Sequence, residues 1–257
     1  MELVRAAIFG IIQGLTELLP VSSSGHLAVF NHVFGYSPQE EFLSHVVLVH
    51  AGTLLAIALA FGRDILGLFT RNRRLIPLLA AGTVPAGVFG ILARDFFGAI
   101  SANMVLVGIG FLATAAFLLL AARPQAAAKN IDALSLTDAV AVGLAQALAV
   151  LPGVSRSGST ICVAQGRGAD ASCAARFSFL LMMPAVGGAT LLDARGLLAC
   201  GHSWDILPAA VSFAAAFAAA ACALKLLMSL LRRGRLFYFS CYLVPLGIAV
   251  MLYGLLC

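Results

Sequence analysis

Six uninterrupted apolar runs constrain this chain more than any other feature of its sequence. A helix that crosses a bilayer needs about 20 predominantly apolar residues. The runs cover residues 42–62, 75–93, 103–122, 171–192, 206–231 and 236–256. Charged residues make up 11% of the 257 residues, whereas soluble domains carry about 25%. The chain is therefore predicted to be an all-α membrane protein with six transmembrane helices.

Two further apolar stretches are too short to span, and each is interrupted by a polar break. Residues 3–19 lead into a Pro/Ser/Gly-rich break and then 25–35, and residues 136–151 lead into a similar break and then 158–167. A short helix, a break and a second short helix predict a re-entrant hairpin. Irregular backbone at membrane depth is tolerated only inside protein or beside a wet cavity, so we expect both breaks to be enclosed.

The two breaks are similar to each other in sequence. When Ser22 is placed on Ser155, a constant offset of 133, eight of sixteen positions match between 10–25 and 143–158. The single membrane domain then divides into repeat one, a linker and repeat two, at 1–122, 123–135 and 136–257. Each half holds one re-entrant hairpin and three spans. Because three is odd, the halves enter the membrane in opposite directions, which predicts an inverted-topology repeat with its site near the midplane.

The basic residues favour one orientation of this repeat. If residues 63–74 are cytoplasmic, twelve of the sixteen Lys and Arg residues fall inside, three outside, and Arg156 at a hairpin tip. Cytoplasmic loops are enriched in Lys and Arg, so both termini and the mouth of the first hairpin are expected on the outer face. The net charge of +5 is explained by these loops and does not indicate a nucleic-acid partner.

Glu17 is a carboxylate in an otherwise apolar helix. It follows Gln13 by one turn, so the two side chains share a face. Ionisable groups within the membrane are costly and are functional candidates by default. The alternative is an acid at a helix end that is merely solvated near the interface, and we favour the functional interpretation.

A serine run, Ser22, Ser23 and Ser24, precedes His26. Serines at a helix start cap the helix, and the backbone N–H groups there form an anion site. Capping alone for any serine, and a structural hydrogen bond for His26, are the alternatives. A hydroxyl nucleophile needs a nearby base that a third group orients. Ser23, His26 and Glu17 have those types, although the sequence leaves open which serine faces the imidazole.

Arg156 is predicted at the tip of the second hairpin. A guanidinium is always charged and binds phosphate oxygens with two N–H groups, while nearby hydroxyls add donors and nearby glycines allow close backbone approach. The predicted substrate-binding or phosphate-binding residues are Gln13, Ser22, Ser24, Gly153, Ser155, Ser157, Gly158 and Thr160. The alternative for Arg156 is a structural salt bridge to Glu17, which would still bring the two hairpins together.

Residues 13–17, 20–26 and 152–160 closely resemble the two signature motifs of the bacterial undecaprenyl-diphosphate phosphatases, the bacitracin-resistance family. The resemblance continues through 175–181 and covers the whole chain. It implies a multi-pass hydrolase of the bacterial plasma (inner) membrane. Such an enzyme converts undecaprenyl diphosphate to undecaprenyl phosphate and inorganic phosphate, recycles the carrier lipid for peptidoglycan synthesis and confers bacitracin resistance.

The same resemblance implies catalytic roles for Glu17, Ser23, His26 and Arg156. It implies a polyprenyl diphosphate substrate, surrounding membrane lipids as partners and no organic cofactor, and it leaves a homodimer open. Gln13 stands where the family has either Glu or Gln. An amide at position 13 disfavours a metal site made of two acids, which puts a direct role for Mg²⁺ or Ca²⁺ in doubt. A cation held by Glu17 stays an open alternative.

The mechanism expected from these residues is phosphoryl transfer beside the two hairpin tips. Ser23 attacks the terminal phosphorus or orients the attacking water, His26 handles the proton, and Glu17 orients His26 or binds metal. The site is expected to open to the outer, periplasmic face. A lipid-phosphate flippase is the main rival, because inverted repeats with broken helices are a transporter architecture. The Ser-x-x-His spacing beside a carboxylate favours hydrolysis, and too few polar residues lie in the other spans to line a channel.

Overall fold

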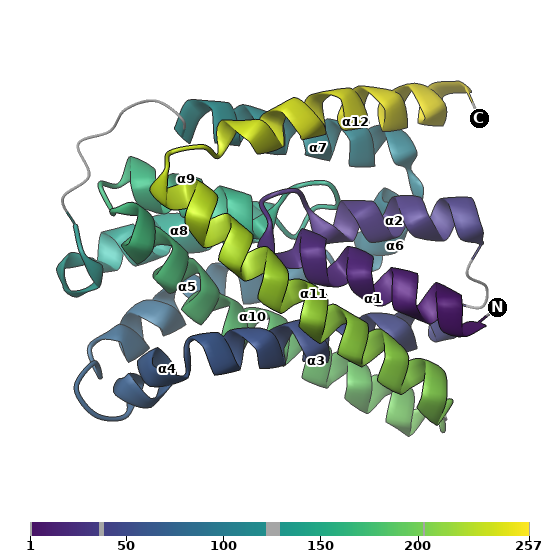
Figure 1. Ribbon diagram of the computed structural model, residues 1–257, viewed down its shortest axis with the longest axis horizontal. Coiled ribbons are helices and arrows are strands. Elements are labelled where there is room, and N and C mark those ends of the chain that lie inside the picture. Colours follow the sequence, from purple (N-terminus) through teal and green to yellow (C-terminus); the bar gives the residue numbers. More distant parts are fainter. Residues whose placement is uncertain (1, 36–38, 122–128, 203, 257) are drawn as a thin grey trace.

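The computed structural model describes residues 2–35, 39–121, 129–202 and 204–256, which are almost entirely helical (Figure 1). The helices in chain order are α1 (Glu2–Leu18), α2 (Ser23–Phe34), α3 (Gln39–Ala60), α4 (Gly62–Leu68), α5 (Leu75–Leu92), α6 (Arg94–Ala102), α7 (Met104–Ala121), the 3₁₀ helix η1 (Ile131–Ala133), α8 (Leu136–Leu148), α9 (Arg156–Gly166), α10 (Ala171–Ala199), α11 (Ile206–Arg232) and α12 (Phe237–Leu256).

The six predicted spans are confirmed as helices long and apolar enough to cross a membrane. They are α3, α5, α7, α10, α11 and α12. The boundaries agree within a few residues except at α10, which continues to Ala199 rather than ending at 192. The short helices α4 and α6 occupy connecting segments where hydropathy alone predicted no regular element. The described residues therefore form the predicted all-α fold.

Both predicted re-entrant hairpins are pairs of short helices, α1 with α2 and α8 with α9. Pro20 and Pro152 lie in the breaks, where a missing N–H is tolerated, and Gly153 turns the second break with φ of 87°. Ser22 and Ser155 cap α2 and α9, each accepting a hydrogen bond from the backbone N–H three residues later. The equivalent residues of the two breaks thus perform the same local task.

Each hairpin packs against a span from the other half of the chain. Helix α1 lies along α11, and α8 lies along α5, while the third spans of the two halves, α7 and α12, pack on each other (Figure 1). Small residues allow the close approach, since a Cβ on Gly10 or Gly14 would overlap backbone carbonyl oxygens of α11. Membrane helices commonly associate through such small-residue contacts.

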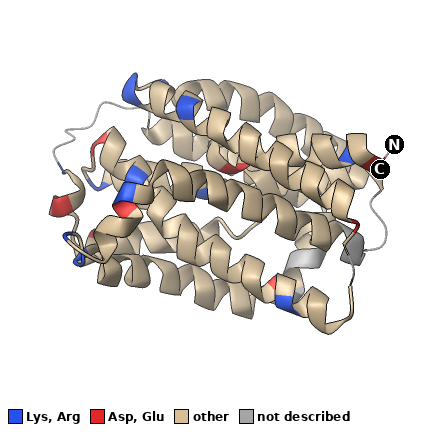
Figure 2. Cartoon of the chain, turned by 60° about the horizontal axis from the view of Figure 1, so that its bottom comes forward, with Lys and Arg blue, Asp and Glu red and all other residues tan. Residues whose placement is uncertain are grey.

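Lysine and arginine gather at one end of the helix bundle, on the left in Figure 2. Among these charges, Asp138 accepts hydrogen bonds from Lys129 at 2.8 Å and Arg167 at 2.9 Å, and Arg176 pairs with Asp64. Burial alone would raise the pKa of Asp138, but hydrogen bonds from Lys129, Ser135 and Arg167 outweigh it and hold that pKa well below its usual range.

The predicted linker, 123–135, lies partly outside the described residues. Its described part, 129–135, contains η1 and a single bridge between Lys129 and Ala169. The division of the chain into two repeats stays a prediction.

Candidate active site

The two hairpin breaks meet at Glu17, near the C-terminal end of α1. Arg156, at the start of α9, donates from Nη2 to Glu17 Oε1 at 2.5 Å. Ser157 donates to the Leu19 carbonyl oxygen at 3.1 Å. The side chains of Arg156 and Glu17 are 12% and 6% exposed, so the ion pair is almost enclosed. The salt bridge considered from the sequence therefore forms, and it joins segments 139 residues apart.

The second carboxylate oxygen of Glu17 has a different set of neighbours. Glu17 Oε2 accepts hydrogen bonds from Ser23 Oγ at 2.5 Å and Gln13 Nε2 at 2.8 Å. His50 Nε2, from α3, lies 3.6 Å from the same oxygen. Oε1 thus binds the guanidinium, while Oε2 faces a hydroxyl, an amide and an imidazole. This division places a carboxylate in direct contact with the Ser23 hydroxyl.

Backbone strain accompanies the position of Ser23. Ser22, its neighbour, has φ of 68°, and it is the one non-glycine residue with positive φ in the described part of the chain. Such conformations cost about 1–3 kcal/mol and concentrate at functional sites. Here the turn lets Ser22 cap α2 through the Gly25 N–H while Ser23, half-buried, directs its hydroxyl back toward Glu17.

His26 is oriented away from Ser23. Its Nδ1 lies 2.7 Å from the Ser22 carbonyl oxygen, and its Nε2 lies 2.8 Å from the Tyr242 hydroxyl of α12. A carbonyl only accepts, so we assign the hydrogen to Nδ1, and Nε2 of the neutral ring accepts from Tyr242. The serine–histidine–acid order expected from the sequence stays a prediction. In this structure Ser23 contacts the acid Glu17 directly, and both ring nitrogens of His26 have other partners. The cause is local, since Ser22 lies one helical turn before His26 and its carbonyl binds the ring.

Arg156 retains donors that no described residue uses. Its Nε and Nη1 atoms are buried and have no hydrogen-bond partner within the described ranges. A buried donor without a partner costs about 1–3 kcal/mol, more for a charged group. Two open N–H groups in a planar fork match the oxygens of a phosphate. The Ser159 hydroxyl is also buried and without a partner among the described residues.

Most other predicted phosphate-binding residues have protein partners in this structure. Ser155 caps the Gly158 N–H at 3.1 Å, and Thr160 shares a 2.6 Å hydrogen bond with Ser178 of α10. Ser22 caps α2 as described above, Ser157 joins the two hairpins, and Ser24 is exposed. These contacts give the hydroxyls a structural role, and their role as phosphate ligands stays a prediction.

Helix α7 fixes the tip of the second hairpin. The Thr114 hydroxyl donates to the Gly153 carbonyl oxygen at 2.9 Å and accepts from the Ser155 N–H at 2.8 Å. A Cβ on Gly110 would overlap the Pro152 carbonyl oxygen. The break therefore rests directly on the α7 backbone, which positions Arg156 at the start of α9.

Two residues at the site were not identified from the sequence, His50 and Tyr242. His50 lies within the apolar run 42–62, and an ionisable residue at such a position is a signal that could have found it. Tyr242 carries no comparable signal, because a tyrosine in a transmembrane helix is common near interfaces.

The donors around Glu17 do not form a metal-ligand set. Gln13 points its amide N–H at the carboxylate, and the Arg156 guanidinium lies 2.5 Å from it. Within the described ranges, no three His, Cys, Asp or Glu side chains come close enough together to hold a metal ion. A divalent cation prefers several oxygen ligands, and its role here stays a prediction.

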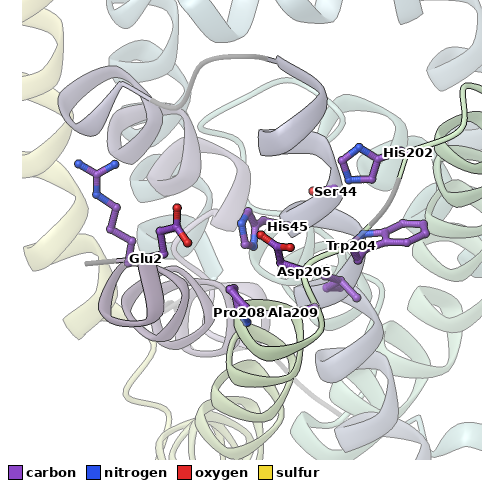
Figure 3. A pocket seen from close by; sticks show the side chains of 10 residues that line it. Glu2, Ser44, His45, His202, Trp204, Asp205, Pro208 and Ala209 are labelled. Atoms are coloured by element: carbon purple, nitrogen blue, oxygen red, sulfur yellow. The ribbon is translucent and has the colours of Figure 1, made fainter.

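A separate cavity of about 200 Å³ lies at the other end of α1 (Figure 3). Its lining includes Glu2, His45, His202 and Asp205. Because Glu2 and Glu17 stand at opposite ends of α1, this cavity is not part of the site around Glu17.

Comparison with known proteins identifies the family. The family model for the bacitracin resistance protein BacA matches residues 6–249. Three similar proteins, each named undecaprenyl-diphosphatase, come from Carboxydothermus hydrogenoformans (40% identical, 98% of this chain and 97% of the relative), Thermodesulfovibrio yellowstonii (38%, 98% and 97%) and Rhodopirellula baltica (39%, 99% and 99%). The site described above lies within the matched residues. The chain belongs to the bacitracin resistance protein BacA family.

Proposed function

We propose that this protein is an integral membrane hydrolase that converts undecaprenyl diphosphate to undecaprenyl phosphate and inorganic phosphate. The names of its relatives support the substrate and reaction. The observation that carries the proposal is the contact of the Ser23 hydroxyl with a buried carboxylate, beside a guanidinium that has two open N–H groups. Recycling of the carrier lipid for cell-wall synthesis and bacitracin resistance follow from this activity.

In the proposed reaction, Arg156 binds oxygens of the terminal phosphate through Nε and Nη1. The Ser23 hydroxyl attacks the phosphorus, and Glu17 accepts its proton at Oε2, the oxygen to which it is already bonded. Positioning and charge stabilisation supply most of the catalysis in phosphoryl transfer. His26 holds Nε2 toward Tyr242 on the exposed side, and its catalytic role stays a prediction.

We further propose an inverted repeat whose basic end lies in the cytoplasm and whose site opens to the outer face of the inner membrane. The reciprocal packing of α1 on α11 and α8 on α5 supports the repeat. The gathering of Lys and Arg at one end supports the orientation. The diphosphate lipid reaches the site from the surrounding lipids, and a homodimer is a prediction that mass measurement in detergent can test.

Purified protein supplied with undecaprenyl diphosphate tests the proposal. We expect release of inorganic phosphate together with undecaprenyl phosphate, and loss of both products in Ser23→Ala. Parallel assays with chelator and with added Mg²⁺ or Ca²⁺ test the role of a cation. Protein that binds the lipid under every condition yet releases no phosphate would contradict the proposal and favour the flippase.

A further inference from the structure

His50 faces the proton-accepting oxygen of Glu17 in a defined tautomer. It lies in the transmembrane helix α3, and its Nδ1 is 2.8 Å from the Val46 carbonyl oxygen. Because a carbonyl only accepts, Nδ1 carries a hydrogen. The remaining nitrogen, Nε2, therefore presents a lone pair to Glu17 Oε2 at 3.6 Å. Two acceptors that face each other attract only when a proton lies between them.

The arrangement around Glu17 connects this nitrogen to Ser23. Ser23 Oγ donates to the same oxygen, Oε2, at 2.5 Å, whereas Oε1 is occupied by Arg156. A proton that leaves Ser23 thus arrives on the oxygen that faces His50. The 3.6 Å separation exceeds the usual 2.7–3.2 Å of an N–H···O bond. Catalytic hydrogen bonds are commonly long without substrate and tighten in the substrate complex.

We propose that His50 is a positioning residue that takes the proton which Glu17 accepts from Ser23, so that Glu17 and His50 act together as the base of the reaction. The inference rests on the proposed phosphatase function. A carboxylate paired with a guanidinium is a weak base by itself, because protonating it breaks the ion pair. Passing the proton to His50 restores the Glu17–Arg156 pair and adds an imidazolium next to the carboxylate.

The proposed step is balanced in atoms and charge. As the Ser23 Oγ–P bond forms, the bond from phosphorus to the bridging oxygen breaks, and its electron pair leaves with undecaprenyl phosphate. The Ser23 proton moves to Glu17 and then to His50 Nε2. Water next attacks the phosphorus of the phosphoserine, and the Oγ–P bond breaks with its electron pair going to Oγ. The phosphate leaves with the water oxygen and both water protons, while Ser23 Oγ regains its proton from His50 through Glu17. No other reactant is required.

The proposal predicts how activity depends on pH. His50 must be neutral at Nε2 to receive the proton, so its protonation at acid pH removes activity, and activity rises as pH increases through its titration. The charged groups that act on His50 include Glu17 from α1 and Arg156 from α9. Other charged residues on the helices packed against α3 are Glu2 and Arg5 (α1), Arg63 and Asp64 (α4), Arg176, Asp193 and Arg195 (α10), and Lys225 and Arg232 (α11). If His50 only held Glu17 in place, replacing His50 would lower activity by the same factor at every pH.

His50→Gln is the decisive variant, since glutamine has a similar length and can donate to Glu17 but cannot take up a proton. We expect kcat to fall about 100-fold, within the range of general-base assistance. KM should change little, because Arg156 keeps its open donors. In the wild type, protonation of His50 lowers kcat/KM at acid pH. In His50→Gln this decline should begin at a lower pH. His32→Gln, the same change at an exposed position of α2, should keep the wild-type rate and profile.

A double-variant cycle separates the proposal from independent roles. The effects of residues that act as one unit are strongly non-additive. The double variant Glu17→Gln/His50→Gln should therefore be only slightly slower than Glu17→Gln alone. Multiplicative effects, a His50→Gln rate within threefold of wild type, or a slow variant with the wild-type pH profile would each overturn the proposal. Thermal unfolding reveals any misfolded variant, in which case His50→Asn is judged by the same criteria. A wild-type protein that releases no phosphate would instead contradict the proposed function itself.

Discussion

Replacing Arg156 with lysine tests whether the guanidinium fork binds the substrate phosphate. The structure assigns Nη2 to Glu17 at 2.5 Å and leaves Nε and Nη1 buried without a partner in the described ranges. Lysine keeps the positive charge and can still pair with Glu17. It lacks the two additional N–H groups in fixed geometry that would meet phosphate oxygens. We therefore expect Arg156→Lys to remain folded and to lose turnover.

The size of the loss follows from the two donors that are removed. A hydrogen bond to a charged group contributes about 1.5–3 kcal/mol, so two of them amount to about 3–6 kcal/mol. Since each 1.36 kcal/mol is tenfold in rate, kcat/KM should fall by about 10²–10⁴-fold. If the fork holds the phosphate more tightly in the transition state than in the bound substrate, most of this loss appears in kcat.

The assay is phosphate release from undecaprenyl diphosphate by purified protein, with kcat and KM measured separately. Arg167→Lys provides the matched control, because Arg167 lies at the other end of α9 and pairs with Asp138 instead. This control should stay within about twofold of wild type, as expected for a change at the surface. If Arg156→Lys is folded and loses less than tenfold in kcat/KM, the guanidinium does not bind the phosphate through two N–H groups. Arg156 would then act as a point charge or as a structural partner of Glu17.

Three further predictions address the nucleophile, the topology and the packing of the hairpin tip. Ser23→Ala should reduce phosphate release by at least about 10³-fold, in the range seen for lost nucleophiles, while lipid binding persists through Arg156. In a cysteine-free background, a membrane-impermeant thiol reagent outside intact cells should label Ala99→Cys but not Asn72→Cys. Gly110→Ala should destabilise the protein by about 1–3 kcal/mol, as overpacking does, because its Cβ would overlap a hairpin carbonyl.

Each of these has a result that would count against it. Ser23→Ala with near-normal phosphate release would assign the nucleophile to water or another hydroxyl. The reverse labelling pattern would move the mouth of the first hairpin to the cytoplasmic face. For packing, Gly90→Ala is the control, since a Cβ there meets nothing within 4 Å, and equal melting temperatures for both variants would show that the tip does not rest on α7.

The local architecture of this protein could be predicted from sequence because it depends on short-range physical chemistry. Apolar runs near bilayer length must be helical to satisfy their backbone groups, and all six predicted spans are helices of that kind. Pro20 and Pro152 each lie between two short helices, and the serines that follow them cap the second helix of each pair. Glu17 and Arg156 were identified because a charge in such surroundings is costly unless it has a partner, and each is the other's partner.

The side-chain partners at the site were decided by tertiary structure. Ser23, His26 and Glu17 are close in sequence, and their residue types favoured a serine–histidine pair. The strained turn at Ser22 instead directs Ser23 to Glu17, and the Ser22 carbonyl and Tyr242 bind the two nitrogens of His26. His50 reaches the same carboxylate only because α3 and α1 pack together. Hydropathy and residue type specify which groups must be buried, whereas helix packing across the two halves of the chain determines which of them meet.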